Sequence, residues 1–204
     1  MRVRISTYCS IRNNQIKLNG EALLTKGVEV SFNEFIKSAY DLNASSYLKF
    51  FKMDDLCKLA FVASEFLLKN RKLSEQYGIE NVSLLFANTS SSLDTDINYY
   101  NTVKDFASPS LFVYTLPNIM LGEISIRNKF KGENAFFVFE HFQADFLCNY
   151  ATQLIREQKA KTVVIGWVEL LNENYEAFLC LVEEAAADGI ALTKENLSKY
   201  YNGK

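Results

Sequence analysis

Short apolar runs that alternate with amphipathic segments constrain the fold of this chain most strongly. The clearest run is VSLLFAN, Val82–Asn88, which is bounded by polar residues on both sides. A strand of this kind is usually covered on both faces, as in an α/β sheet. Three further apolar runs follow along the chain: ENAFFVFE, KTVVIGWVE and YEAFLCLVEEA. The last two are joined by the polar LLNEN, which predicts an antiparallel hairpin.

The segments between these strands have the spacing of helices. KMDDLCKLAFVASEFLLKN is the strongest, because its apolar residues repeat with helical period and many of them are Ala or Leu. SFNEFIKSAYDL begins with Ser31 three residues before Glu34, which is the pattern of a capping box. QADFLCNYATQLIREQ follows the ENAFFVFE strand, and a short last helix begins at a Thr193 cap.

One predicted helix contains both a proline and a glycine. It spans Thr115–Phe130, with Pro117 in its first turn, where a missing N–H costs little. Gly122 in its middle predicts that another segment packs closely against it. With a first strand at Arg2–Cys9, the element order is β-α-α-β-α-α-β-α-β-β-α. This order predicts an α/β fold with a mixed, mostly parallel five-stranded sheet and helices on both faces.

Composition and charge exclude several classes of protein. Of the 204 residues, 49% are hydrophobic and 23% are charged, which is the composition of a folded globular chain. No Gly/Ser linker or low-complexity tract divides the sequence, so we expect one domain over residues 1–204. The net charge of −2 argues against nucleic acid as a partner. No apolar run approaches the roughly 20 residues of a membrane helix, so we expect no membrane span.

The cysteines and the known ligand-binding motifs argue against a metal or a cofactor. The four cysteines are far apart and there is one histidine, which predicts buried free thiols, no metal site and a cytoplasmic protein. No GxGxxG follows a strand, and neither GxxxxGK[ST] nor GxSxG occurs, so we expect no cofactor. Met1 and the polar ending YYNGK have the character of true termini. What stands out is the loop at 139–143, where a strand ends in Glu-His.

Several stretches resemble the N-terminal half of the β-ketoacyl-acyl carrier protein synthases, which are thiolase-like condensing enzymes. These stretches are FFKMDDLCKLAFVASEFLL, LLFANTSSSLDTD, SPSLFVYTLPNIMLGEISIRNKFKGEN and KTVVIGWVE, and they cover most of residues 50–170. Within this family, the sequence most resembles short, divergent synthase-like proteins of pigment and unusual fatty-acid pathways. The resemblance implies a thiolase-like half-fold without the family's C-terminal catalytic half.

The family's spacing assigns a histidine to the position of the catalytic cysteine. In the synthases, eight residues separate a turn glycine from the cysteine, and 27 separate the cysteine from a strand acid. Counting forward from Gly132 and back from Glu169 reaches the same residue, His141. An imidazole does not form a durable acyl thioester, and Cys148 further along is expected to be a buried helix thiol. The resemblance therefore leaves open whether this chain is an enzyme.

The resemblance also implies where an acyl chain or a carrier arm would lie. A remnant tunnel would be lined by Glu140, His141, Phe142 and Asn118. The alternative for Glu140 and His141 is a buried, hydrogen-bonded pair at the boundary of a secondary-structure element.

Acyl carrier protein is acidic, so its docking site would be basic. The candidates are Lys49, Lys52, Lys104 and Arg127, the last in a small cluster with Lys129 and Lys131. The alternative is that these residues belong to an ordinary solvated surface.

Three functions follow as hypotheses. The leading one is a non-elongating, synthase-like subunit in fatty-acid or polyketide-type biosynthesis, for a pigment or an aryl-polyene-like product. It would bind acyl carrier protein or pair with a full-length ketosynthase, as chain-length factors do. The second is an acyltransferase or condensing subunit completed in trans by a partner, and the third is a scaffold without an acyl ligand. The family dimerises through the strand before the nucleophile, here ENAFFVFE, which is either an edge strand open to a homo- or heterodimer or a central one.

Overall fold

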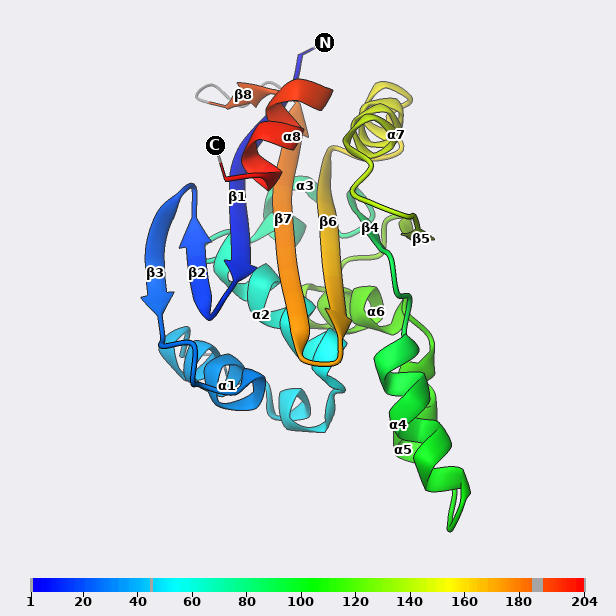
Figure 1. The fold of residues 1–204 in the computed structure, drawn as a ribbon. Coiled ribbons are helices and arrows are strands. Elements are labelled where there is room, and N and C mark those ends of the chain that lie inside the picture. The colour runs from blue at the N-terminus through cyan, green and yellow to red at the C-terminus, as the bar shows by residue number, and fades with distance from the viewer. Residues whose placement is uncertain (1, 45, 185–188, 204) are drawn as a thin grey trace.

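One mixed sheet organises the residues that the computed structural model describes, 2–44, 46–184 and 189–203. The strand order is β3-β2-β1-β7-β6-β4-β5, and β8 pairs with β1 outside this path (Figure 1). The strands are β1 (Val3–Arg12), β2 (Gln15–Leu18), β3 (Glu21–Thr25), β4 (Val82–Asn88), β5 (Asn134–Val138), β6 (Thr162–Leu171), β7 (Asn174–Glu184) and β8 (Ile190–Ala191).

Helices and short 3-10 turns occupy the connections. They are α1 (Phe32–Leu42), η1 (Leu48–Lys52), α2 (Asp55–Leu67), α3 (Leu73–Tyr77), α4 (Leu93–Val103), α5 (Pro109–Phe112), η2 (Val113–Thr115), α6 (Ile119–Asn128), α7 (Ala144–Arg156) and α8 (Lys194–Tyr201). None of the helices in the described ranges is long and apolar enough to cross a bilayer.

The prediction of five mostly parallel strands is wrong in number and in direction. The described residues form an eight-stranded sheet in which the parallel pairs are β4 with β5 and β4 with β6. The pairs β1–β2, β1–β7, β1–β8, β2–β3 and β6–β7 are antiparallel, and β6–β7 is the predicted hairpin. The strands β2 and β3 follow two turns, Asn13-Asn14 and Asn19-Gly20, whose four residues all have positive φ. Such turns are typical of hairpins, and Asn-Gly is their strongest sequence signal.

Helices cover both faces of the sheet, as predicted. On one face, Leu84 and Phe86 of β4 belong to a core with residues of α1, α2 and α6. On the other face, Leu85 of β4 and Ile165 of β6 pack with residues of α7 and α8. Every residue of β4 is buried, which confirms that this apolar run is covered on both sides.

The two predicted helix starts at Ser31 and Thr193 are confirmed by the side chains that cap them, and Asp54 caps a third helix. The Ser31 hydroxyl accepts from the backbone N–H of Glu34, and the Glu34 carboxylate accepts from the backbone N–H of Ser31. Asp54 accepts from the N–H of Cys57 at 3.0 Å and so begins α2. Thr193 begins α8 in the same way.

The predicted helix over Thr115–Phe130 starts too early. α6 begins at Ile119 with Asn118 as its N-cap, so Pro117 lies before the first turn rather than in it. The cause is local, because the residue before a proline is disfavoured in the helical conformation. Leu116 has φ −110° and ψ 115°, which is extended backbone.

The close packing predicted at Gly122 occurs at another glycine. A Cβ atom built on Gly122 meets no other atom within 4 Å, so that prediction is wrong. A Cβ on Gly132 would lie 2.3 Å from the carbonyl oxygen of Val82. Any side chain at position 132 would therefore separate the segment before β5 from the start of β4.

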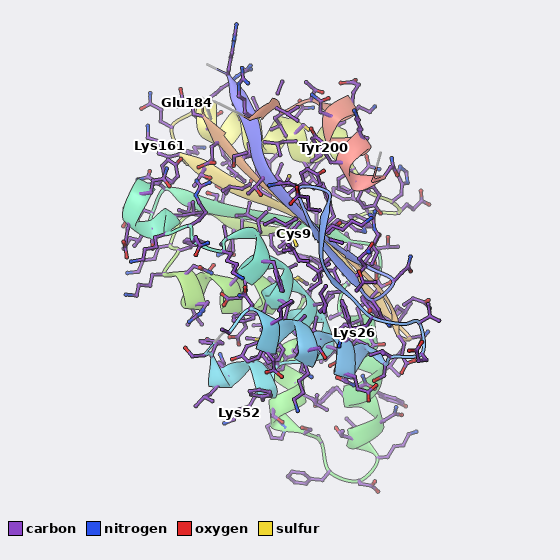
Figure 2. All side chains as sticks on the ribbon, turned by 90° about the vertical axis from the view of Figure 1, so that its left-hand side faces the viewer. Cys9, Lys26, Lys52, Lys161, Glu184 and Tyr200 are labelled. Carbon is purple, nitrogen blue, oxygen red and sulfur yellow. The ribbon has the colours of Figure 1, made fainter. Side chains whose placement is uncertain are left out.

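The cysteines lie inside the molecule as free thiols, Cys9, Cys57, Cys148 and Cys180. Figure 2 shows Cys9 among the side chains beneath β1. Burial raises the pKa of both Cys9 and Cys148 to about 12, so these thiols stay protonated at neutral pH. The prediction that Cys148 is a buried helix thiol is confirmed.

Candidate functional site

The connection between β5 and α7 places His141 at the entrance to a helix. His141 lies two residues before Gln143, the N-cap of α7, and three before Ala144, its first residue. The imidazole Nε2 is 3.0 Å from the side-chain amide nitrogen of Gln143. The strand–turn–helix arrangement that the spacing predicted around residue 141 is therefore present.

Glu140 and His141 are exposed, so the interpretation of a buried pair is wrong. Together with Phe142 they line an open cleft of about 660 Å³. Asn118 is exposed at the start of α6 and lies outside the lining of this cleft. The structure thus brings together three of the four residues predicted for the tunnel, and it forms an open cleft there.

Aromatic side chains pack against one another at the cleft. Phe142 stacks on Tyr201 of α8 with ring centroids 4.0 Å apart, and its edge meets Trp167 of β6. The Arg12 guanidinium carbon of β1 lies 4.4 Å from the centre of the Tyr201 ring. Sequence reasoning identified Phe142 but missed Trp167 and Tyr201, because neither belongs to a recognisable motif.

Glu176 of β7 connects these aromatic groups by hydrogen bonds. Its Oε1 accepts from the Trp167 indole N–H at 2.9 Å and from the Tyr201 hydroxyl at 2.6 Å. Its Oε2 accepts from Arg12 Nε at 2.7 Å. Burial, followed by the hydrogen bond to Glu176, raises the pKa of Tyr201 above its ordinary value. The phenol therefore remains a hydrogen-bond donor at neutral pH.

Glu169, the strand acid of the spacing argument, lines the same cleft as His141. Its Oε2 accepts from two successive backbone N–H groups after β4, those of Thr89 at 2.6 Å and Ser90 at 3.1 Å. Its Oε1 is shielded from solvent and has no hydrogen-bond partner among the described residues. The two residues of the spacing argument, His141 and Glu169, thus line the same cleft.

The cleft is lined by acids. Glu140, Glu169 and Glu176 contribute carboxylates, and no Lys or Arg of the described ranges lines it. A neighbouring groove shares Glu169 and Glu176 and adds Glu29 and Glu173, with Arg12 as its cation. Arg12 pairs with Glu176 at 2.7 Å and balances its charge, which leaves Glu140 and Glu169 as the carboxylates that disfavour an anionic substrate in this cleft. No three His, Cys, Asp or Glu side chains in the described part of the chain gather as metal ligands.

Two of the four predicted docking cations already have acidic partners. Lys49 forms an ion pair with Glu123 of α6 at 2.6 Å, although its side chain is 48% exposed. Arg127 binds both carboxylate oxygens of Glu65 on α2, at 3.2 and 3.1 Å. Both pairs link α6 to α2 or to the segment before it.

The other two cations, Lys52 and Lys104, form no ion pair with an acid of the described residues. Lys52 is exposed at the end of η1, on the outer surface in Figure 2. Lys104 is exposed at the end of α4, where its ammonium group lies 6.0 Å from the centre of the Tyr100 ring. Docking at any of these four residues stays a prediction.

No family model and no curated protein matches the sequence. Several solved structures have a similar fold. The structure of "The ishigamide ketosynthase/chain length factor" matches this chain with a TM-score of 0.66 and 17% sequence identity, and the match covers 94% of this chain and 65% of that chain. That of a ketosynthase in complex with its chain length factor from Xenorhabdus doucetiae has a TM-score of 0.57 and 14% identity, covering 92% and 81%.

A β-ketoacyl synthase from Burkholderia phymatum STM815 has a TM-score of 0.59 and 12% identity, covering 100% of this chain and 61% of the other. The chain thus spans less than two thirds of the first and third of these proteins. At such identities the likeness is one of fold, and it confirms the predicted thiolase-like architecture. This chain has the fold of the ketosynthases.

Proposed function

We propose that this chain is a non-elongating, ketosynthase-like subunit of fatty-acid or polyketide-type biosynthesis that pairs with an active ketosynthase. The observation that carries the proposal is His141 at the entrance to α7, on a ketosynthase fold, where the spacing calls for the nucleophilic cysteine. Solved structures of the same fold include complexes with chain length factors, which supports a role as the partner of an enzyme.

The chemistry of the cleft supports the absence of elongation. No thiolate is available there, because the cysteine nearest in sequence, Cys148, is buried with its pKa raised to about 12. The lining carboxylates would repel the carboxylate of a malonyl group, which the condensation reaction consumes. The second candidate, a condensing subunit completed in trans, would have to bind such an anion in an acidic cleft.

The edge of the sheet supports pairing. β5 is the last strand in the sheet order, and Val138 at its end is 55% exposed. An edge strand presents unpaired backbone N–H and C=O groups, which a strand of another chain satisfies. The sequence left open whether ENAFFVFE is an edge or a central strand, and the observed order makes it an edge. A single domain over residues 1–204, a cytoplasmic location, and docking of acyl carrier protein at Lys52 and Lys104 complete the proposal.

The first experiment is copurification with a candidate ketosynthase. We expect His141→Ala to copurify as well as the unchanged chain, because His141 has no part in pairing at β5. We also expect the complex to release CO2 from malonyl-acyl carrier protein equally well with either form. A release that depends on His141 would support the second candidate and contradict this proposal.

The second experiment tests the position itself. We expect His141→Cys to react with iodoacetamide faster than the native thiols do, since residue 141 is exposed at the entrance to α7 and the native cysteines are buried. The unchanged chain is the control, and its four buried thiols should react slowly. Equal, slow labelling of both forms would show that residue 141 does not occupy a nucleophile's position.

A further inference from the structure

A third cavity lies on the α2 and α6 side of the sheet, where these two helices end and α3 begins. It is a groove of about 500 Å³, and the charged residues that line it are Glu65, Lys69, Arg71, Lys72, Glu75, Arg127 and Lys129. Five of these are cations and two are acids, so the groove is basic although the whole chain has a net charge of −2.

Two arginines of the groove are fixed in place by carboxylates behind them. Arg127 binds Glu65, whose side chain is 11% exposed. Arg71 binds Glu183 at 2.6 Å, and the Glu183 side chain is 5% exposed. A guanidinium group has five N–H donors, and these pairs use only part of them. The walls of the groove therefore carry two arginines in fixed positions, and each arginine keeps guanidinium N–H donors that another acceptor can use.

The lysines at the rim are less engaged. The ammonium groups of Lys69 and Lys129 form no ion pair or hydrogen bond with any described residue. Lys72 pairs with Glu75 at 3.1 Å, but both side chains are largely exposed, at 76% and 69%. An exposed pair of this kind stabilises little, so it leaves Lys72 free to exchange partners.

The arrangement of the cations around the groove fits an extended anion. Lys69 follows the end of α2 and Lys129 follows the end of α6, so the two rim lysines come from different helices. The negative ends of both helix dipoles disfavour an anion on the floor of the groove. Carboxylates spaced along a polypeptide can instead meet the two separate lysines at the rim. We propose that this groove docks an acidic segment of a partner polypeptide, with Lys69 and Lys129 as its principal contacts.

This proposal goes beyond the proposed function, since Lys69, Arg71 and Lys72 are not among the predicted carrier-docking cations, although Arg127 and Lys129 of its cluster are. The probe is a fluorescein-labelled helical peptide of Glu and Ala, titrated with the full chain in a fluorescence-anisotropy assay. We expect Lys69→Glu together with Lys129→Glu to weaken binding by about tenfold or more, because each rim attraction becomes a repulsion. The alanine versions of both residues should give an intermediate loss.

The matched control reverses the charge of two exposed lysines outside the groove, Lys26 and Lys199. Lys26 lies near the end of β3, as Figure 2 shows. This control has the same net charge as the test variant, so an equal loss of binding in both would overturn the proposal. Displacement of the peptide by inorganic phosphate or by single-stranded DNA at matched ionic strength would also overturn it. Unchanged thermal unfolding of all variants separates binding from folding.

Discussion

The helices α2 and α4 are similar in length but differ in how they are attached to the molecule. α2 buries ten of its 13 residues, whereas Thr95 is the buried residue of the 11 in α4. Leu93, Ile97 and Tyr100 of α4 are 44%, 45% and 67% exposed, and they follow one another at helical spacing. In Figure 1, α4 and α5 project from the lower end of the sheet. Apolar residues thus secure α2 within this chain, while Leu93, Ile97 and Tyr100 of α4 stay exposed.

α4 is attached through polar contacts at its first turns. The Thr95 hydroxyl donates to Asp54 at 2.5 Å, and Asp54 is also the N-cap of α2. The backbone N–H of Asn172 donates to Asp94 at 2.9 Å, and the Ser92 hydroxyl donates to the carbonyl of Thr115 at 2.7 Å. A few hydrogen bonds therefore fix the orientation of a helix that buries little apolar surface.

The largest expected effect is on the buried helix. Phe61 of α2 is fully buried and packs against Tyr47 and Phe50. Phe61→Ala should lower the free energy of unfolding by about 3–5 kcal/mol, because it removes apolar contacts and leaves a cavity. Urea unfolding followed by circular dichroism measures the change. The matched control is Phe106→Ala beyond α4, where the side chain is 81% exposed and we expect almost no change. Similar losses for both would contradict the contrast between the two regions.

The next effect is at the residue that joins the two helices. Asp54→Ala should cost about 1–3 kcal/mol, because it removes the cap of α2 and leaves the buried Thr95 hydroxyl without its acceptor. It should also speed hydrogen exchange in α4 more than in α2. Asp54→Asn keeps an acceptor for the N–H of Cys57 and is the control. If Asp54→Ala leaves exchange in α4 unchanged, Asp54 does not fix that helix.

The same pair of variants predicts a dependence on pH. Burial raises the pKa of Asp54 above its ordinary value of 3.8, and hydrogen bonds from Cys57 and Thr95 only partly oppose it. The folded state therefore binds the Asp54 proton more tightly than the unfolded state does. As the pH rises from the ordinary pKa to the raised one, ionisation of Asp54 lowers the free energy of unfolding. Asparagine does not titrate. The stability of Asp54→Asn relative to the unchanged chain should therefore increase from acidic to neutral pH in chemical unfolding, and a constant difference would contradict the shift.

The smallest effect on folding should be found on the exposed face of α4. Ile97→Ser and Tyr100→Ser should change the free energy of unfolding by about 0.5 kcal/mol or less, as is usual for surface positions. If the apolar residues of α4 contact a ketosynthase partner, the double variant should lose copurification with it. Asn98→Ser on the same helix, also exposed, is the control. If the double variant still copurifies with the ketosynthase, Ile97 and Tyr100 do not contact that partner.

Much of the fold could be read from local signals. The side chains of Ser31, Asp54 and Thr193 cap the first turns of three helices. The apolar run of β4 predicted a strand that is buried on both faces. Strands β2 and β3 were missed although Asn19-Gly20 signals a hairpin, because their alternating residues bury little more than Ile16. Neither strand therefore has the continuous apolar pattern that identified the others.

The candidate site was less predictable, because it depends on contacts between distant segments. Spacing located His141 and Glu169, which lie on one stretch of chain. It could not reveal that Tyr201 covers Phe142, or that Glu176 accepts from both Trp167 and Tyr201. Such pairs follow from the order of strands in the sheet, which short-range patterns do not encode. The exposure of Glu140 and His141 follows from the same long-range arrangement.

The Arg12 guanidinium also donates to the backbone carbonyl of Tyr201. Arg12 and Tyr201 are 189 residues apart in the sequence. The aromatic side of the cleft therefore forms only once this long loop of chain has closed. Without α8 the Phe142 ring would lose its stacking partner Tyr201, so a variant chain that lacks α8 would expose additional apolar surface to chaperones and proteases.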